Sequence, residues 1–366
     1  MSLPTWAGAP RWPQFRFRPD HTGYNPIEDR ISVQNVSNLQ VGWTFTASLG
    51  YRSAPAVTGG SLFIGSGGTL YSLDAKTGAR LWRFTEPLAC CLGSPGVWRG
   101  RVFFGTDRGT VYALDAMTGA KLWVYATGGP VWSGVTIADG MVYVSTGAGG
   151  RVFALDALTG EKVWSTDIGT DVYAAPALRN GTLYVPSSFN STFWALDAST
   201  GMVLWTGAIG YTTDSSPAVG GDLVYVGSDD GKLYAFYAAG CGEPTCSPVW
   251  TATTSDAISS SPAVAYGIVI VGSNDNNVYA FDAATGAQRW KVVTSDWVGL
   301  ASAAVANGVA YIGGSDGVLR AVGARSGRVL WMYSIGANLP YGPSVVDGWV
   351  YIGPSDNTLY AFHLPT

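Results

Sequence analysis

Two pairs of cysteines are the residues whose types and spacing most directly suggest chemistry. Cys90 and Cys91 are adjacent, and Cys241 and Cys246 bracket a short CGEPTC turn. Two local pairs in a chain with only two histidines favour disulfides over a metal site. Free paired thiols are the alternative. A disulfide between adjacent cysteines is strained, and strain of this kind is typical of functional sites. We predict that both pairs are oxidised in an extracytoplasmic location, whether secreted, periplasmic or at the cell surface.

A second set of candidates precedes a recurring segment that resembles Ser-Pro-Ala-Val. Three positions before its proline the repeat has unlike residues, so the repeat itself does not require them. They are Arg52, Leu92, Trp132, Tyr173, Asp214, Ser259, Leu300 and Pro340. The predicted ligand- or cofactor-binding residues are Tyr51, Arg52, Cys90, Cys91, Trp132, Tyr173, Asp214 and Trp297. An arginine beside aromatic rings suits a carboxylate or a planar ring. An ordinary channel rim is the alternative.

We predict no catalytic residue and no metal ligand. The two histidines, His21 and His363, lie near the two ends of the sequence, so no Ser-His-Asp or Cys-His nucleophile set is available. Turns such as Ser228–Gly231 are rich in Asp and Asn, as calcium loops are. They lack the repeated acidic ligand set, and Asp-Gly is what a tight hairpin turn needs.

These residues must be positioned by a repeat with a period of about 40 residues. Tryptophan recurs at Trp43, Trp82, Trp123, Trp164, Trp205, Trp250, Trp290 and Trp331. Between the tryptophans lie short runs of β-branched and aromatic residues, separated by Gly, Asp and Asn. In the unit from Val203 to Tyr237 we predict strands beginning at Val203 and spanning 213–219, 223–227 and 232–236. Four antiparallel strands in each unit of this length are typical of a propeller blade.

The ends of the sequence predict how the ring closes. Trp43 precedes all eight units, whereas the last unit has no tryptophan of its own. The strand around Val41–Phe45 is therefore expected to complete the final blade and remove its open edge. We predict an all-β, eight-bladed propeller of four-stranded antiparallel blades, closed by the N-terminal strand. It is expected to be a single domain over 1–366, with a leader and closing strand at 1–45 and eight repeats at 46–366.

A turn of pattern A-x-D-x-x-T-G-x-x-x-W recurs at residues 113–123, 154–164, 195–205 and 280–290. Asp and Thr side chains satisfy backbone groups in such a turn, and Gly adopts the positive φ. The tryptophan can then lie flat between two blades. Recurrence in successive units favours a structural role for Asp115 and Asp156 over catalysis.

This turn resembles the tryptophan-docking motif of the quinoprotein (pyrroloquinoline quinone-type) propellers, and the resemblance covers nearly the whole chain. The leader from Trp12 to Trp43 is similar to the opening segment of quinoprotein alcohol dehydrogenases. The resemblance implies an eight-bladed fold that serves both enzymes and non-enzymatic proteins, including an outer-membrane assembly lipoprotein. It also implies that Cys90–Cys91 occupies the place of a disulfide that lies against the quinone in methanol-dehydrogenase-like enzymes.

Several family features of the enzymes are missing. No arginine follows the cysteine pair at Leu92–Gly96, and Thr146–Gly149 lacks the glutamate of the family's calcium site. There is no CxxCH motif for an attached haem, and every unit is close to minimal length. We therefore predict a non-catalytic scaffold that binds a protein, a peptide or a small ligand at the channel mouth. The alternative is a quinone-dependent alcohol or sugar dehydrogenase, with pyrroloquinoline quinone and Ca²⁺ near Cys90–Cys91.

Composition excludes two classes of partner. A formal net charge of −4 gives no basic footprint for nucleic acid. No run of about 18 apolar residues is long enough to span a membrane. The first residues, MSLPTWAGAP, contain no recognisable signal peptide, and we expect an export signal to have been removed. We expect a monomer.

Overall fold

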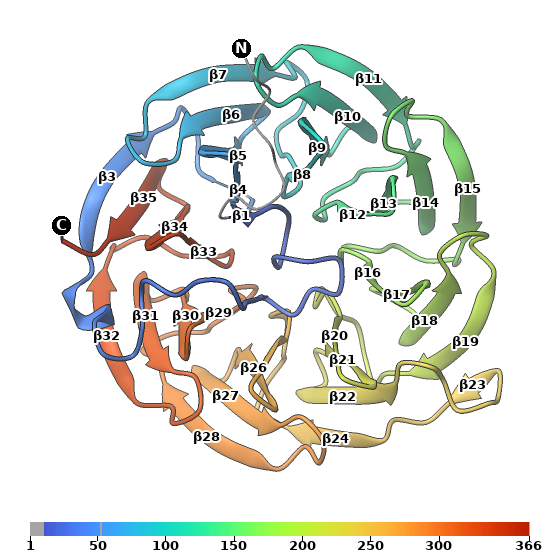
Figure 1. Ribbon diagram of the computed structural model, residues 1–366. Helices are drawn as coiled ribbons and strands as arrows, with labels where there is room; N and C mark the ends of the chain where they lie inside the picture. Colours follow the sequence, from blue (N-terminus) through green and yellow to red (C-terminus); the bar gives the residue numbers. More distant parts are fainter. Residues whose placement is uncertain (1–10, 52, 366) are drawn as a thin grey trace.

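The computed structural model describes residues 11–51 and 53–365 and is built from eight β-sheets arranged in a ring (Figure 1). Each sheet forms one blade whose short inner strand lies nearest the axis. The prediction of an all-β, eight-bladed propeller with four-stranded antiparallel blades is confirmed. A 3₁₀ turn, η1 (Val36–Asn38), is the sole helical segment of the described ranges.

Each blade is listed here from its inner to its outer strand. Blades 1 to 4 contain β4 (Ala56–Thr58), β5 (Ser61–Ser66), β6 (Thr69–Asp74) and β7 (Arg80–Thr85); β8 (Gly96–Trp98), β9 (Arg101–Gly105), β10 (Thr110–Asp115) and β11 (Lys121–Ala126); β12 (Thr136–Ala138), β13 (Met141–Ser145), β14 (Arg151–Asp156) and β15 (Lys162–Asp167); and β16 (Ala177–Arg179), β17 (Thr182–Pro186), β18 (Thr192–Asp197) and β19 (Val203–Ala208).

Blades 5 to 8 contain β20 (Ala218–Gly220), β21 (Leu223–Gly227), β22 (Lys232–Tyr237) and β24 (Trp250–Thr253); β25 (Ala263–Ala265), β26 (Ile268–Ser273), β27 (Asn277–Asp282) and β28 (Gln288–Val293); β29 (Ala304–Ala306), β30 (Val309–Ile312), β31 (Val318–Gly323) and β32 (Val329–Ser334); and β33 (Ser344–Val346), β34 (Trp349–Ile352), β35 (Thr358–His363) and β3 (Gln40–Thr46). Three two-residue strands join the edges of blades 1, 7 and 4: β1 (Arg11–Trp12), β2 (Tyr24–Asn25) and β23 (Thr245–Cys246).

The blade boundaries differ from the sequence unit that we chose. The strand that begins at Val203 is β19, the fourth strand of blade 4, whereas the rest of the unit belongs to blade 5. The strand predicted over 213–219 is also shorter, because pairing with β21 begins only at Ala218. Residues 213–217 lead into the inner strand and lie outside that pairing.

The N-terminal strand closes the ring, as predicted. β3 pairs antiparallel with β35, with Trp43 opposite Ala361, so the first strand of the repeat completes blade 8. Outer strands such as β3 alternate exposed and half-buried residues, whereas middle strands such as β9, β14 and β21 are buried except at their end residues. The apolar side chains of the middle strands pack between neighbouring blades and make up the core.

Each blade is attached to the next by a tryptophan on its outer strand. The Trp43 indole Nε1–H donates to the Ala75 carbonyl at 3.1 Å, across the boundary between blades 8 and 1. Six more tryptophans make the equivalent bond: Trp82, Trp123, Trp164, Trp250, Trp290 and Trp331. The accepting turn is held by its aspartate, since Asp74 Oδ1 accepts the Thr77 N–H and the Thr77 hydroxyl, both at 2.8 Å. Asp115 and Asp156 accept the Thr118 and Thr159 N–H in the same way, both at 2.8 Å, as expected for residues that hold the turn.

Trp205 is the exception, because the turn that it reaches has a different sequence. Here the A-x-D-x-x-T-G pattern is replaced by an insertion closed by the Cys241–Cys246 disulfide. The Ala238 carbonyl accepts the Tyr184 hydroxyl at 2.8 Å, while the buried Trp205 Nε1–H has no partner among the described residues. The insertion carries β23, which pairs parallel with β19 and joins blades 4 and 5 at their outer edge.

The leader crosses the axis of the ring (Figure 1) and bonds to the inner strand of every blade. β1 pairs with β4 in blade 1, and Asn25 Nδ2 donates to the Val345 carbonyl of blade 8 at 2.8 Å. Between these two contacts, leader oxygens accept an N–H from the inner strand of each remaining blade at 2.7–2.8 Å. The donors are Val97, Ile137, Leu178, Val219, Val264 and Val305. These N–H groups point to the axis and would otherwise lack a partner.

Arg16 and His21 of the leader are buried at the axis. The Arg16 guanidinium donates to the Pro262 and Ala303 carbonyls of blades 6 and 7. Burial lowers the pKa of Arg16 to about 9 and, together with the Arg16 charge, the pKa of His21 to about 3. His21 Nε2 lies 3.0 Å from the Thr136 hydroxyl. A neutral, buried histidine of this kind is structural.

Gly78 offers a test of the tryptophan contact. It adopts a φ of +72°, and a Cβ added there would lie 2.5 Å from the Trp43 ring, whereas a Cβ at Gly60 (φ +81°) would meet nothing within 4 Å. Gly60→Ala is expected to lower the free energy of unfolding by about 1 kcal/mol through φ alone. Gly78→Ala should cost roughly 1–3 kcal/mol more through overpacking. Denaturant titration measures both variants, and equal losses would contradict the contact.

Ring closure is tested by truncation. A chain that begins at residue 48 lacks β3 and the leader, which leaves β35 as an open edge and every inner strand without its leader partner. We expect this chain to aggregate or unfold, because unpaired edge strands recruit other chains. Size-exclusion chromatography and thermal unfolding measure the effect, with a chain that begins at Arg11 as the control. A monomeric truncated chain with the control's melting temperature would refute closure by β3.

Candidate functional site

The channel along the axis is closed at one end by the leader and open at the other. Phe15 of the leader lines the inner part, a cavity of about 150 Å³. A wider space of about 420 Å³ lies at the mouth. Trp132, Tyr173 and Tyr341 line both. The mouth is formed by the loops that connect each outer strand to the next inner strand, so its lining can vary from blade to blade.

Small residues surround the cavity because eight inner strands converge there. Ser94, Ser133, Ser216, Ser261 and Ser302 line it, as expected from the small residues that precede each proline. The serines also link the blades: the Ser261 hydroxyl oxygen accepts the Ser216 N–H at 3.0 Å, and the Ser302 oxygen accepts the Ser261 N–H at 2.9 Å. The wall of the cavity is therefore polar and well fixed.

Aromatic side chains form one side of the mouth. The Trp132 ring, 44% exposed, lies 5.0 Å from the Tyr173 ring, and Tyr173 lies 5.8 Å from Phe189 in an edge-to-face contact. Two hydrogen bonds hold Tyr173 in place. Its backbone N–H donates to Ser188 Oγ at 3.1 Å, and its hydroxyl donates to Asp171 Oδ2 at 3.2 Å. The cluster presents flat apolar faces to the mouth without closing it.

Asp214 supplies a carboxylate to the cavity wall. Its side chain is exposed to the channel, and no hydrogen bond or ion pair joins it to the described residues. Neighbouring Asp229 is satisfied, since it accepts the Thr212 hydroxyl at 2.8 Å and the Ser259 hydroxyl at 3.0 Å. Desolvation in the concave wall, and secondly the Asp229 charge, raise the pKa of Asp214 to about 6. An unpaired carboxylate with a raised pKa is typical of a binding or catalytic site.

The adjacent cysteines are not joined, which corrects our expectation for that pair. Their sulfurs lie 3.2 Å apart, and the Cys90 thiol donates to Asp107 Oδ2 at 3.0 Å. The Asp107 carboxylate also accepts the Cys90 N–H at 3.1 Å and so holds the reduced pair in place. This hydrogen bond is the main cause of a Cys90 pKa raised to about 12. Cys91 lines the mouth, whereas Cys90 is exposed outside it. The predicted Cys241–Cys246 disulfide is confirmed.

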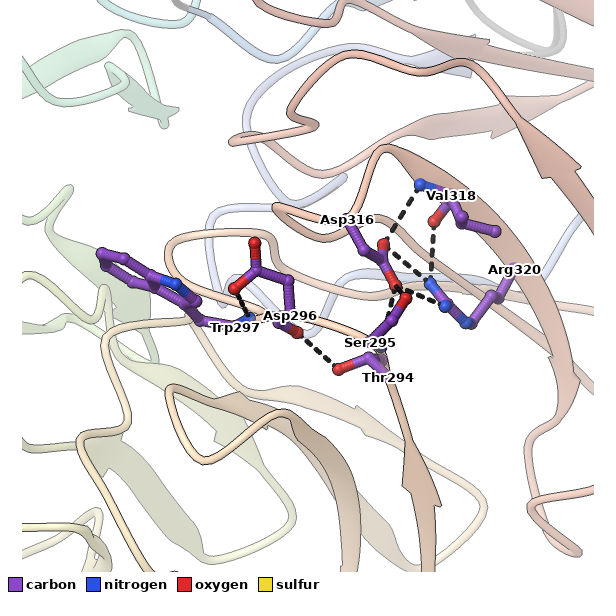
Figure 2. Close-up of polar contacts among 7 residues, drawn as sticks. All are labelled: Thr294, Ser295, Asp296, Trp297, Asp316, Val318 and Arg320. Atoms are coloured by element: carbon purple, nitrogen blue, oxygen red, sulfur yellow. Dashed lines mark hydrogen bonds and ion pairs between the residues drawn. The ribbon is translucent and has the colours of Figure 1, made fainter.

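Two other predicted site residues do not line the channel. Tyr51 is buried, and its hydroxyl donates to the Phe45 carbonyl at 3.1 Å. Trp297 is 55% exposed and points away from the buried Asp316–Arg320 pair that anchors its loop (Figure 2). Ser295 connects the loop to this pair, because its hydroxyl donates to Asp316 Oδ2 at 3.0 Å. Arg52 lies outside the described residues.

The structure adds two channel residues that the sequence comparison of blades did not select. Phe15 reaches the channel from the leader, which lies outside the repeat. Tyr341 occupies a position that is small in every other blade, and that irregularity was the available signal. The channel thus unites Cys91, Trp132, Tyr173 and Asp214 of the predicted set with Phe15 and Tyr341.

The lining does not fit the calcium-bound quinone of the enzymes. Ca²⁺ takes six to eight oxygen ligands, including carboxylates. Asp214 is the one carboxylate among the described residues lining the two spaces, and Asp229 behind it is already hydrogen-bonded. Residues 11–51 and 53–365 contain no group of three or more His, Cys, Asp or Glu side chains arranged to hold a metal ion. They also contain no helix long and apolar enough to cross a membrane.

The fold and the channel define a quinoprotein-type repeat propeller with an axial cavity. The family model described as outer membrane protein assembly factor BamB matches residues 29–131, 66–167, 107–243 and 213–366. Because these matches together cover most of the sequence, the chain belongs to this family.

Curated relatives match over shorter stretches. The chain is 30% identical to the quinohemoprotein alcohol dehydrogenase ADH-IIG of Pseudomonas putida over 99 residues, 24% of this chain and 14% of the relative. It is 30% identical to the quinohemoprotein alcohol dehydrogenase of Comamonas testosteroni over 112 residues, 27% of this chain and 16% of that enzyme. The matches thus span about a sixth or less of each enzyme.

Solved structures share the fold. The Comamonas testosteroni quinohemoprotein alcohol dehydrogenase superposes with a TM-score of 0.83 at 16% identity, over 97% of this chain and 80% of that chain. BamB from Moraxella catarrhalis gives 0.75 at 22% identity, over 89% of this chain and 99% of that chain.

Asp214 yields a prediction for stability. Its pKa in the folded protein lies above the usual value of about 4. The folded state therefore binds the proton more tightly, and stability is lost as pH rises from about 4 through 6. Asp214→Asn should raise the free energy of unfolding at pH 7.5, by no more than about 1 kcal/mol because the carboxylate contacts solvent. The gain should vanish below about pH 4.

Asp282 provides the control of opposite sign. Arg289 and Thr285 lower the pKa of Asp282 to about 2, so Asp282→Asn should destabilise the protein at pH 7.5. Thermal unfolding of both variants across this pH range measures the two effects. If Asp214→Asn were destabilising at pH 7.5, the carboxylate would have a stabilising partner and the description above would be wrong.

Proposed function

We propose that this protein is an extracytoplasmic, non-catalytic propeller that binds a protein, a peptide or a small ligand at its channel mouth. The observation that carries the proposal is the composition of the cavity. Serine hydroxyls, aromatic rings and one carboxylate suit recognition. The described lining provides no histidine to act as a base and no set of carboxylates to hold a divalent cation.

Two further observations support a scaffold. The family model that spans the chain is described as an outer membrane assembly factor, and the superposed BamB structure is covered almost completely. The Cys241–Cys246 disulfide supports an extracytoplasmic location, because disulfides persist in oxidising compartments. We further propose that the chain folds as a single domain, since β3 and the leader connect the first and last blades.

The rival function is quinone-dependent dehydrogenation of an alcohol or sugar. Its support is the set of curated relatives and the position of Cys91 at the mouth. The channel lining argues against this function, because Asp214 is the one carboxylate among its described residues and Ca²⁺ needs several oxygen ligands. If quinone bound nevertheless, Trp132 and Cys91 would be among the residues that hold it, and it would supply the two-electron oxidation.

The two functions are separated by a titration with pyrroloquinoline quinone and Ca²⁺. We expect no saturable change in quinone absorbance and no alcohol- or sugar-dependent reduction of an electron-accepting dye. A quinohemoprotein alcohol dehydrogenase assayed in parallel is the positive control. Stoichiometric quinone binding with substrate-dependent dye reduction would refute the scaffold function.

A further inference from the structure

The mouth end of the ring is an acidic surface. Loops and turns at this end contain many acidic residues: Glu86, Asp107, Asp167, Asp171, Asp214, Asp229, Asp230, Asp256, Asp275, Asp296, Asp316 and Asp356. The described basic residues there are few and mostly paired. Arg151 lies 3.8 Å from Asp167, Lys232 lies 3.4 Å from Asp230, and Arg320 is buried against Asp316 at 2.5 Å. The electrostatic potential at the mouth therefore attracts cations.

Within this surface the channel presents a carboxylate beside aromatic faces. Asp214, Trp132, Tyr173 and Tyr341 line the cavity, and none of its described lining residues is basic. A desolvated carboxylate pairs most favourably with an ammonium or guanidinium group. Tryptophan and tyrosine faces also attract such cations. Both components of the lining thus favour the same ligand chemistry.

Exposed apolar side chains surround the opening beyond the cavity itself. Leu88, Phe189, Tyr211 and Trp297 are between 55% and 71% exposed, and all lie in loops at this end. A small amine would leave these side chains uncovered, whereas a polypeptide laid across the mouth would cover them. Exposed aromatic side chains, and arginine among the residues of the partner, are enriched at protein–protein interfaces.

We propose that the mouth binds a partner polypeptide through a lysine or arginine side chain that enters the channel, with Asp214 as its counter-ion and Trp132, Tyr173 and Tyr341 as its walls. This inference rests on the proposed binding function and specifies its partner. Ser216 and Ser261 provide polar contacts around the inserted group. Phe15 of the leader sets the depth that the side chain can reach.

The test uses random peptides displayed on phage and panned on the immobilised protein. Parallel targets are Asp214→Asn and Asp167→Asn, which remove the same charge from the same end, inside and outside the cavity. We expect peptides enriched in lysine and arginine on the native protein and on Asp167→Asn, with the enrichment lost on Asp214→Asn. Failure to enrich basic residues, or equal enrichment on all three targets, would overturn the proposal.

A synthetic peptide from the selection then measures affinity by calorimetry. Replacing its key lysine or arginine with glutamine, or Asp214 with Asn, should weaken binding about tenfold to a hundredfold, as expected for a charge-assisted hydrogen bond. Methylammonium and methylguanidinium serve as small-cation probes. Binding of either as tight as the peptide's would overturn the polypeptide part and assign the site to a free amine.

The pH dependence offers a readout that a merely structural Asp214 would not affect. Peptide binding should weaken as pH falls through about 6, because protonation removes the counter-ion. Among the described residues, the titratable groups that interact electrostatically with Asp214 are Asp229 and Tyr173, and Asp229 accepts hydrogen bonds from two hydroxyl groups. Affinity that is constant from pH 5 to 8 would contradict the role of Asp214. Selection of tight binders without basic residues would refute this inference and leave the scaffold function intact.

Discussion

The contact between an outer-strand tryptophan and the turn of the next blade is the interaction on which the ring depends. A single four-stranded blade has two apolar faces and cannot bury either of them alone. The indole fills the junction and donates its N–H to a carbonyl, while the glycine of the turn lets the ring approach the backbone closely. The same bond at nearly every junction fixes the angle between blades, so eight blades bring β3 back to β35.

Because these contacts repeat, the sequence revealed them directly. The tryptophan period predicted eight blades, and the unpaired Trp43 predicted the closing strand. Asp and Thr at fixed offsets predicted the turns, because their hydrogen bonds are local. The inner strand was placed less well, since residues 213–217 have strand-like composition but lie outside the pairing of β20 with β21. Composition alone does not indicate where pairing begins.

Single-copy features could not be predicted in this way. Phe15 reaches the channel through a leader that makes its contacts far away in the sequence, and no periodicity reports them. The Cys90–Cys91 pair was expected to be oxidised because the four cysteines form two local pairs, but the two sulfurs are not joined, and Asp107 accepts hydrogen bonds from both the thiol and the backbone of Cys90. Trp132, Tyr173 and Asp214 were found because they break the repeat. Tyr51 and Trp297 were selected because they lie close to these positions in the sequence, yet Tyr51 is buried with its hydroxyl on the Phe45 carbonyl, and the exposed Trp297 is not among the residues that line the cavity.

The leader also has a consequence for how the chain acquires its fold. It precedes every blade in the sequence, but its partners are spread over all eight blades, and Asn25 bonds to Val345, 320 residues further along the chain. Contacts of such long sequence separation form late and slowly. Until the last blade is made, the leader and the inner edges remain unpaired, and the protein is exposed to misassembly. The topology therefore makes closure of the ring by β3 and the leader a late and slow step of folding.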